Sequence, residues 1–295
     1  MKSGFVAIVG RANAGKSTLV NILVGEKVAI VSPKPQTTRD RILGVVTNKD
    51  YQIVFVDTPG IYKEGNLLNY SMQKATQDSY KDVDVVLLVV DAHEGLSEKD
   101  ISLIQKFEKL NQKLIVVLSK TDIMPESLLI SELKQLSSVK ADIVPISSRK
   151  GKNIKQLLKL VVSYLNEGEK IFEEDIVTDR SEKFMISEIM REKILLKFDK
   201  EIPHGIAIIV NKFALREDKK VYDISLDIIC EKPNHKAILI GKGGKAIKEV
   251  SSFAREEMER FLDKKVFLTT YVKVEEDWRN SLGKLKEFGY GEENF

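Results

Sequence analysis

A glycine-rich loop near the N-terminus constrains the fold more than any other part of this 295-residue chain. The apolar run Phe5–Val9 leads into Gly10-Arg11-Ala12-Asn13-Ala14-Gly15-Lys16-Ser17, and helix-forming residues continue through Thr18 to Leu23. A Gly-x-x-x-x-Gly-Lys-Ser segment between a strand and a helix is typical of a loop whose backbone N–H groups surround phosphates. Lys16 would face the β- and γ-phosphates, Ser17 would bind Mg²⁺, and the helix N-terminus would favour the anion.

Further apolar runs in the first half predict the rest of an α/β domain. They lack alternation and are separated by helix-length segments, which is typical of parallel strands buried on both faces. The runs are Ile53–Val56, Val85–Val90, Leu114–Leu118 and Ile143–Ile146. A helix from about Ile154 to Leu165 would close this doubly wound, mostly parallel domain, which we place at residues 1–167. Residues 168–180 are acidic and begin with a glycine, so we expect a linker there.

Residues 181–295 have a different pattern, which predicts a small α+β domain with a C-terminal tail. Two β-rich runs are joined by a charged turn, and an amphipathic helix precedes the last strand. The expected elements are helix Lys183–Phe198, strands Ile206–Leu215 and Val221–Cys230, a short strand Ala237–Ile240, helix Lys245–Leu262 and strand Val266–Val274.

Composition excludes several classes of protein. The chain has 47 basic and 44 acidic side chains, a net charge of only +3, so any nucleic-acid surface must be local. Its single cysteine, Cys230, cannot form a disulfide within the chain, which fits a reducing compartment. The longest apolar run, Val85–Val90, is far shorter than the roughly 20 residues of a membrane helix. We expect a cytoplasmic monomer without a transmembrane segment.

Two more segments extend the phosphate site. Asp57-Thr58-Pro59-Gly60 follows the second strand, so Asp57 would hold Mg²⁺ through water and the Gly60 N–H would reach the γ-phosphate. The loop between the two motifs contains Thr37 and Thr38, and the hydroxyl of one of them would complete the Mg²⁺ shell. The alternative for this loop is a polar surface segment. Lys16, Thr38 and Gly60 are the residues we expect to act in catalysis.

Ser119-Lys120-Thr121-Asp122 follows another strand and predicts a base pocket. The Asp122 carboxylate can accept hydrogen bonds from N1 and the exocyclic amine of guanine, a donor pair that adenine lacks. The Lys120 stem can cover the base. Ser147 and Ser148 follow the next strand, and the Ser148 N–H can donate to the guanine carbonyl. A helix cap is the alternative for this serine-rich turn.

A second glycine-rich loop, Gly241-Lys242-Gly243-Gly244, lies in the second half. A Gly-x-x-Gly loop can approach an RNA backbone closely because it has no interfering side chains. Residues 232–248 contain five lysines and no acidic residue, so a basic patch surrounds the loop. Ile238, Ile240 and Ile247 would line a groove for bases or else belong to the core. The expected RNA contacts are Lys236, Gly241, Lys242, Gly243, Gly244, Lys245 and Lys248.

Together these motifs resemble the translation-factor-related GTPases, and the second half narrows the resemblance to the Era family. Pro35-Gln36-Thr37-Thr38-Arg39, the C-terminal domain and Trp278-Arg279-Asn280 carry this narrower resemblance, which covers essentially the whole chain. It implies a GTPase domain with bound GTP or GDP and Mg²⁺. It also implies a KH domain that binds 16S ribosomal RNA near its 3′ end during assembly of the 30S subunit.

The chain departs from the family's pattern at the base motif, where Ser119 replaces the usual asparagine. That asparagine would tie the base loop to the phosphate loop and contact guanine N7. Its loss predicts weaker nucleotide affinity, with guanine preference kept by Asp122.

A second position departs from the pattern of Ras-like enzymes. Ile61 occupies the place of their water-aligning glutamine, so we expect slow intrinsic hydrolysis, raised by an RNA or ribosomal partner or by a cation. Asn13 is placed where related GTPases hold K⁺ against the phosphates, and its alternative role is to shape the loop.

Two other functions compete with ribosome assembly. A membrane-docking signalling GTPase would use the basic C-terminal domain for peripheral contact with the inner face of the cell membrane. A GTPase serving RNA modification would require a further catalytic residue, and the single cysteine, Cys230, lies in a predicted strand.

Overall fold

The computed structural model describes residues 1–60 and 65–290. Packing divides the chain into two compact units. The first comprises Met1–Ala29, Thr38–Lys63 and Met72–Asp179, and the second comprises Ile30–Thr37, Glu64–Ser71 and Arg180–Phe295. This division differs from the predicted boundaries, because two short segments of the first half pack with the second unit and residues 168–179 pack with the first.

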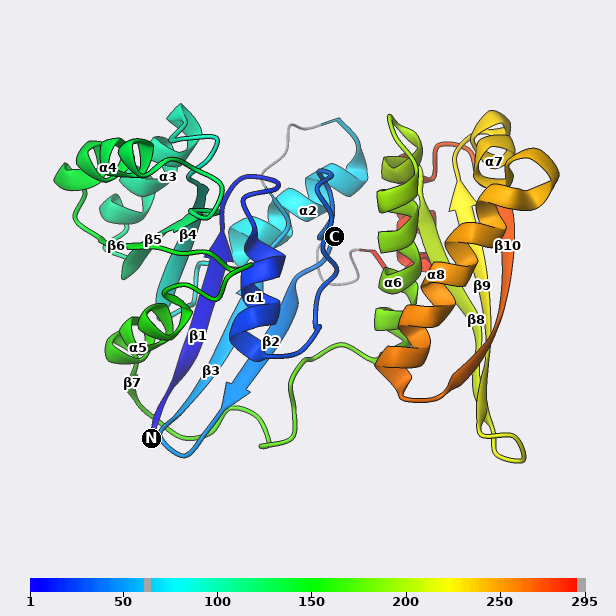
Figure 1. Cartoon of the computed structure of the whole chain (residues 1–295), viewed down its shortest axis with the longest axis horizontal. Helices are drawn as coiled ribbons and strands as arrows, with labels where there is room; N and C mark the ends of the chain where they lie inside the picture. Colours follow the sequence, from blue (N-terminus) through cyan, green and yellow to red (C-terminus); the bar gives the residue numbers. More distant parts are fainter. Residues whose placement is uncertain (61–64, 291–295) are drawn as a thin grey trace. The chain divides into compact units, whose positions relative to one another are not determined.

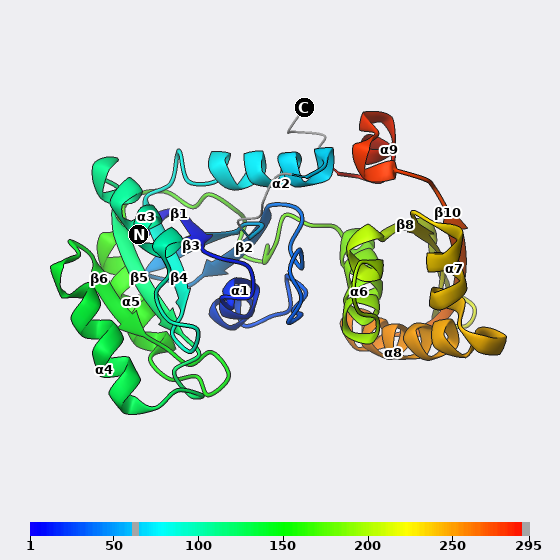
Figure 2. The ribbon, with the colours of Figure 1, turned by 90° about the horizontal axis from the view of Figure 1, so that it is seen from above.

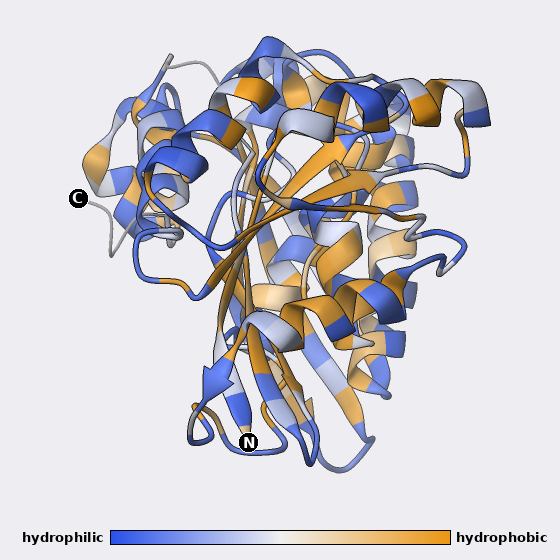
Figure 3. Cartoon of the chain, turned by 90° about the vertical axis from the view of Figure 1, so that its left-hand side faces the viewer, coloured by the Kyte–Doolittle hydropathy of each residue, from blue (hydrophilic) through white to orange (hydrophobic). Residues whose placement is uncertain are grey.

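The first unit is built on a seven-stranded sheet in the order β2-β3-β1-β4-β5-β6, with β7 paired to β1. Neighbours among β1, β3, β4, β5 and β6 are parallel, whereas β2 pairs antiparallel with β3 and β7 antiparallel with β1. The strands are β1 Lys2–Val9, β2 Ile42–Thr47, β3 Tyr51–Asp57, β4 Val85–Asp91, β5 Leu114–Ser119, β6 Asp142–Pro145 and β7 Asn166–Glu167. The central strands are almost wholly hydrophobic, as Figure 3 shows, because both faces are covered.

Helices cover both faces of this sheet (Figures 1 and 2). One core cluster joins the sheet to Leu19 of α1 and Leu157 of α5, and another joins it to Ile104 and Phe107 of α3. The helices are α1 Lys16–Val24, α2 Leu67–Asp78, α3 Glu98–Lys109, α4 Glu126–Gln135 with the 3-10 turn η1 Leu136–Ser138, and α5 Ile154–Tyr164. The predicted doubly wound α/β fold is confirmed, with parallel strand ends meeting at the edge where α1 begins.

The segment predicted as a linker, residues 168–180, is ordered along the first sheet. The Gln52 side chain donates to the Phe172 carbonyl at 2.8 Å and accepts from the Ile171 N–H at 2.6 Å. Farther along, the Val45 N–H donates to the Val177 carbonyl at 2.9 Å. The segment therefore packs on β2 and β3 before the chain enters the second unit.

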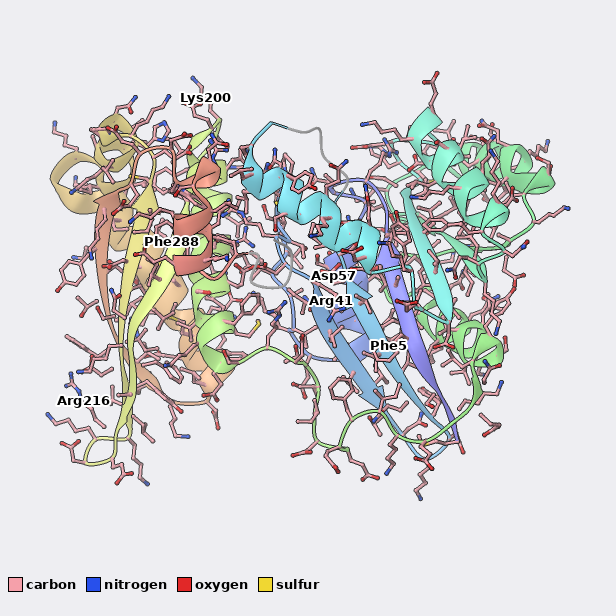
Figure 4. All side chains as sticks on the ribbon, turned by 180° about the vertical axis from the view of Figure 1, so that it is seen from behind. Phe5, Arg41, Asp57, Lys200, Arg216 and Phe288 are labelled. Carbon is pink, nitrogen blue, oxygen red and sulfur yellow. The ribbon has the colours of Figure 1, made fainter. Side chains whose placement is uncertain are left out.

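The second unit is a three-stranded sheet with helices on one face. The strand order is β10-β9-β8, with β8 and β9 antiparallel and β9 and β10 parallel. Figure 1 shows α6 and α8 in front of this sheet, and Figure 4 shows the opposite face. The elements are α6 Glu182–Lys197, η2 Ile202–Gly205, β8 Ala207–Arg216, β9 Val221–Cys230, α7 Pro233–Ile240, η3 Lys242–Gly244, α8 Lys245–Leu262, β10 Lys265–Val274, η4 Trp278–Asn280 and α9 Leu282–Glu287.

The predicted strand Ala237–Ile240 is wrong, because these residues end helix α7. Pro233 stands at the start of this helix, where its missing N–H costs nothing. His235 and Leu239, four residues apart, are buried on one face, while Ile238 is 49% exposed. The second glycine-rich loop therefore joins two helices, not a strand to a helix.

Trp278 is a packing anchor at one end of this sheet. It is fully buried, and its indole N–H donates to the Gly205 carbonyl at 3.0 Å. The rings of Phe288 and Tyr290 pack against it. In the described parts of the chain, no helix has both the length and the apolar character needed to cross a lipid bilayer.

Candidate functional site

The phosphate loop leaves β1 and enters α1 through two glycines that have no room or conformation for a side chain. A Cβ on Gly10 would lie 2.3 Å from the Val89 carbonyl oxygen of β4, and its φ is +148°. Gly15 has a left-handed φ of +93° directly before α1. The loop thus lies against the sheet edge with the helix N-terminus behind it, the geometry of an anion site.

Lys16 is folded over this loop. Its buried Nζ donates to the Gly10 carbonyl at 3.1 Å and the Arg11 carbonyl at 2.9 Å. Burial lowers the pKa of Lys16 to about 8, and the nearby Asp57 carboxylate partly offsets that effect. The two carbonyls hold the Lys16 ammonium in place. A phosphate anion beside it would favour the charged form and raise the pKa of Lys16 again.

Three oxygen-bearing side chains converge beside Lys16. The Ser17 hydroxyl lies 2.7 Å from Asp57 Oδ2 and 2.8 Å from the Thr38 hydroxyl, which is itself 3.3 Å from Asp57 Oδ2. Asp57, labelled at the end of β3 in Figure 4, is fully buried, and its other oxygen, Oδ1, is buried without a hydrogen-bond partner among the described residues. Burial raises the pKa of Asp57. An all-oxygen set with an unsatisfied carboxylate oxygen fits Mg²⁺.

The two candidate threonines of the preceding loop are placed differently. The Thr37 hydroxyl donates to the Lys34 carbonyl at 2.6 Å, so it is used within its own turn. The Thr38 hydroxyl is the one that reaches Ser17 and Asp57.

Two hydrogen bonds from threonine hydroxyls to backbone carbonyls hold the Asp57–Gly60 turn. The Thr58 hydroxyl donates to the Ile8 carbonyl at 2.9 Å, and the Pro59 carbonyl accepts from the Thr76 hydroxyl at 3.0 Å. Gly60 is buried. Ile61, the expected replacement for a water-aligning glutamine, lies outside the described residues.

Arg11 connects the phosphate loop to Gly95 and to Asp100 of α3. Its guanidinium donates to the Gly95 carbonyl at 2.9 Å and forms an ion pair with the buried Asp100 at 3.0 Å. Asp100 also completes the capping box of α3 with Ser97. Sequence reasoning missed this support, although Ser-x-x-Asp at the start of an amphipathic helix is a readable cap signal.

The expected base residues line one cavity of about 130 Å³ next to the phosphate loop. Asp122 lies in it, and the Ser147 hydroxyl donates to Asp122 Oδ1 at 2.7 Å. This hydrogen bond holds the pKa of Asp122 below its usual value. The Lys120 ammonium pairs with Asp91 at 2.5 Å, which fixes its stem. The lining residues are Gly15, Thr18, Ser119, Lys120, Asp122, Ile123, Ser148 and Arg149.

Ser119 ties the base strand to the phosphate loop. Its buried hydroxyl donates to the Ala14 carbonyl at 2.6 Å and lies 3.1 Å from the Val90 carbonyl. The expectation that serine at this position removes the tie is therefore wrong. A hydroxyl has one proton, so the bond to Ala14 uses the donor that N7 of guanine would need.

The serine-rich turn is not a helix cap. The residue before α5 is Asn153, and that helix has no side-chain cap. Ser147 instead accepts from the Lys150 N–H at 3.1 Å and orients Asp122, while Ser148 lines the base cavity.

The second glycine-rich loop is a tight turn between α7 and α8. Gly241 has φ +72°, and a Cβ there would lie 2.7 Å from the Ala246 Cβ. Gly243 and Gly244 also have positive φ, but a Cβ on either would meet no atom within 4 Å. Lys242, Lys245 and Lys248 are exposed around this turn, and Lys236 is half-buried. The open backbone and these cations suit a phosphate chain.

The groove isoleucines divide between surface and core. Ile238 is 49% exposed beside the loop. Ile247 is half-buried and packs against the core of the second unit. His93, His204 and His235 belong to no cluster of three or more metal-binding side chains within the described residues.

Comparison with known protein families identifies both halves. Residues 5–120 match the family described as 50S ribosome-binding GTPase, and residues 201–279 match the KH domain family.

Relatives match the whole chain. The GTPase Era of Clostridium kluyveri is 44% identical over 292 residues, 98% of this chain and 99% of that protein. The GTPase Era of Alkaliphilus oremlandii is 45% identical over 98% of this chain and 99% of its own.

Two solved structures have the same fold over 98% of this chain and 99% of theirs. One is a single-residue variant of Aquifex aeolicus Era bound to GDP.AlF4-, with a TM-score of 0.92 and 41% identity. The other is Era in complex with MgGDPNP and nucleotides 1506–1542 of 16S ribosomal RNA, with a TM-score of 0.93 and 40% identity. With a GTPase domain followed by a KH domain and such identity over nearly its full length, this chain belongs to the Era family of GTPases.

Proposed function

We propose that this GTPase hydrolyses GTP at the phosphate loop and uses its KH domain to bind 16S ribosomal RNA near the 3′ end, assisting assembly of the 30S subunit. The observation that carries the first part is the convergence of Ser17, Thr38 and the buried Asp57 beside Lys16. The adjoining cavity, with Asp122 oriented by Ser147, supports guanine as the base.

In this proposal the side chains of the site have separate roles. Ser17 and Thr38 would hold Mg²⁺ by their hydroxyls and Asp57 through water, and the bound ion would neutralise phosphate charge. Lys16 exchanges its two loop carbonyls for the β- and γ-phosphate oxygens of GTP. The Gly60 N–H donates to the γ-phosphate. Catalysis then consists of positioning and charge stabilisation, for which no covalent intermediate is needed.

We further propose that intrinsic turnover is slow and is raised by an RNA or ribosomal partner or by K⁺. Asn13 is exposed in the phosphate loop, so its side chain is accessible to a cation, and its left-handed φ of +63° is one that asparagine adopts more readily than most residues. Equal turnover in matched K⁺ and Na⁺ buffers would exclude the role of K⁺.

RNA binding by the second unit is supported by the Gly241–Gly244 turn and its exposed lysines. A relative of 40% identity has been solved with nucleotides 1506–1542 of 16S ribosomal RNA, which makes this RNA the probe of choice. We propose the chain acts as a monomer in the cytoplasm.

The test measures binding of labelled 1506–1542 RNA and GTP hydrolysis with the same protein preparation. Lys242→Asp with Gly243→Asp should abolish RNA binding because it places two carboxylates at the backbone contact, while hydrolysis in the absence of RNA stays at the wild-type rate. Unchanged RNA affinity in this variant would overturn the proposal that the Gly241–Gly244 turn is a clamp on the RNA backbone. Tighter binding to anionic vesicles than to RNA would favour the membrane-docking alternative.

RNA modification is not supported, because the one cysteine offers no nucleophile. Cys230 is fully buried in β9, and burial raises the pKa of its thiol. A reactive cysteine needs the opposite, a lowered thiol pKa and access to substrate.

A further inference from the structure

We propose that the open face of the KH-domain sheet is a second contact surface for single-stranded RNA, centred on Phe267 and Tyr271 of β10. This inference extends the proposed RNA binding of the unit to a face away from the Gly241–Gly244 turn.

The two rings point away from the helix-covered side of the sheet. Strand residues alternate faces, and the neighbours Val266, Leu268 and Val272 pack with the core that α6 and α8 share. Phe267 is 55% exposed and Tyr271 is 56% exposed. Figure 4 shows this face with α9 at its upper end and Arg216 near the hairpin at its lower end.

Small side chains separate the two rings. The register places Thr269 of β10 beside Ser225 of β9, midway between the two rings, and Lys212 of β8 lies opposite Ser225. The small side chains of Thr269 and Ser225 leave space between the rings for a flat base. Four residues along a strand separate the rings by about 13 Å, so they would stack on two different bases of one extended strand.

Cations are fixed over the same face by two buried carboxylates. Asp223 holds Lys212 at 2.7 Å and the Arg216 guanidinium at 2.9 Å, and Asp227 holds Lys273 at 2.5 Å. Both aspartates are more than nine-tenths buried.

Arg216 is one of these cations and also contacts one of the two rings. Its guanidinium lies over the Phe267 ring at 5.3 Å. Three positive heads thus stand around the two rings at set positions, with the long side chains already ordered before a ligand arrives.

This combination favours a nucleic acid over an apolar protein surface. The three cations outnumber the two carboxylates by one, so the cluster keeps a net positive charge toward a phosphate chain. The exposed aromatic rings bind bases by stacking, whatever the sequence. The core of a protein–protein interface is depleted of charged residues, whereas the two rings here are flanked by Lys212, Arg216 and Lys273.

The experiment titrates labelled 1506–1542 RNA with the full chain carrying Phe267→Ala and Tyr271→Ala. We expect the affinity to fall about tenfold for each ring removed, which lies in the lower part of the range for base stacking. The cations are left intact because truncating Lys273 would leave Asp227 buried without its partner. Phe253→Ala is the matched control, because the Phe253 ring is about as exposed, at 52%, but lies on α8. The RNA affinity of this control variant should equal that of the wild type.

Two further variants separate the outcomes. Tyr271→Phe keeps the ring and should bind RNA like the wild type. If Phe267→Ala with Tyr271→Ala binds as tightly as the wild type while Lys242→Asp with Gly243→Asp does not bind, the sheet-face site is overturned and the glycine-loop clamp stands. The reverse pair of results would overturn the clamp and support the sheet face.

Discussion

The Ser119 hydroxyl donates a 2.6 Å hydrogen bond to the Ala14 carbonyl, and this bond joins the end of β5 to the phosphate loop. Both residues are buried, so the bond is shielded from water. The base pocket and the phosphate loop are therefore positioned together, although the side chain that connects them is shorter than the asparagine of the family's usual pattern.

Ser119→Ala should weaken binding of GDP and GTP by roughly 2- to 10-fold, since a lost hydrogen bond costs about 0.5–1.5 kcal/mol. The Ala14 carbonyl would also lose its partner inside the protein. Titration with a fluorescent GDP analogue measures the effect. Ser119→Asn, which restores an amide donor, is the matched control and should bind at least as tightly as the wild type. Equal affinity for Ser119→Ala would show that the bond has no role in binding.

Thr38→Ala should remove most of the Mg²⁺-dependent hydrolysis of GTP, because its hydroxyl is the one that reaches Ser17 and Asp57. Thr37→Ala is the matched control, since that hydroxyl bonds the Lys34 carbonyl within its own turn. The measurement is phosphate release at saturating GTP with increasing Mg²⁺. A larger loss in the Thr37 variant than in the Thr38 variant would contradict the assignment.

The pKa of Asp122 is below its usual value, mainly because the Ser147 hydroxyl donates to it. A lowered carboxyl pKa means that the charged form persists to lower pH, so the free-energy contribution is complete above the unfolded-state pKa and is lost as pH falls through the lower folded value. Ser147→Ala should shift the Asp122 titration to higher pH. Carboxyl ¹³C chemical shifts of the two proteins, followed from pH 7 down to the acid limit of folding, measure this directly. Coinciding titration curves would exclude the role of Ser147.

Much of the fold could be predicted from the sequence because its signals are local. The unbroken apolar runs specify buried parallel strands, and the Gly10–Ser17 loop fixes which edge of the sheet carries the site. Strand β2 was missed although Ile42-Leu43-Gly44-Val45-Val46 is itself an apolar run, because Gly44 interrupts it. Helix α7 was misassigned because the apolar residues Ala237–Ile240 outweighed Pro233, the helix-start signal before them.

The residues of the candidate site and their chemical roles could be predicted from sequence motifs, but the contacts between them depend on tertiary structure. Sequence places Thr37 and Thr38 side by side and leaves open which of them faces the metal. It marks Ser119 as a substitution but does not reveal that a hydroxyl still reaches Ala14 across 105 residues of chain. The Arg11–Asp100 pair joins residues that no short motif connects.

Two glycines of the Gly241–Gly244 turn, Gly241 and Gly243, give a final, steric prediction. Gly241→Ala should reduce both RNA affinity and the free energy of unfolding, because its Cβ would lie 2.7 Å from that of Ala246 at a left-handed φ of +72°. Something must shift between α7 and α8 to accommodate it. Gly243→Ala is the control without a clash: its φ of +60° and ψ of +27° form the left-handed conformation, which alanine adopts at a cost of about 1 kcal/mol, and the new methyl group meets no atom within 4 Å. Gly241, with φ +72° and ψ +173°, has a conformation that is open essentially to glycine alone. Denaturant unfolding and RNA titration of the two variants separate the effects. The clash and the backbone conformation both predict a clearly larger loss of stability for Gly241→Ala, and equal losses in the two variants would contradict both causes.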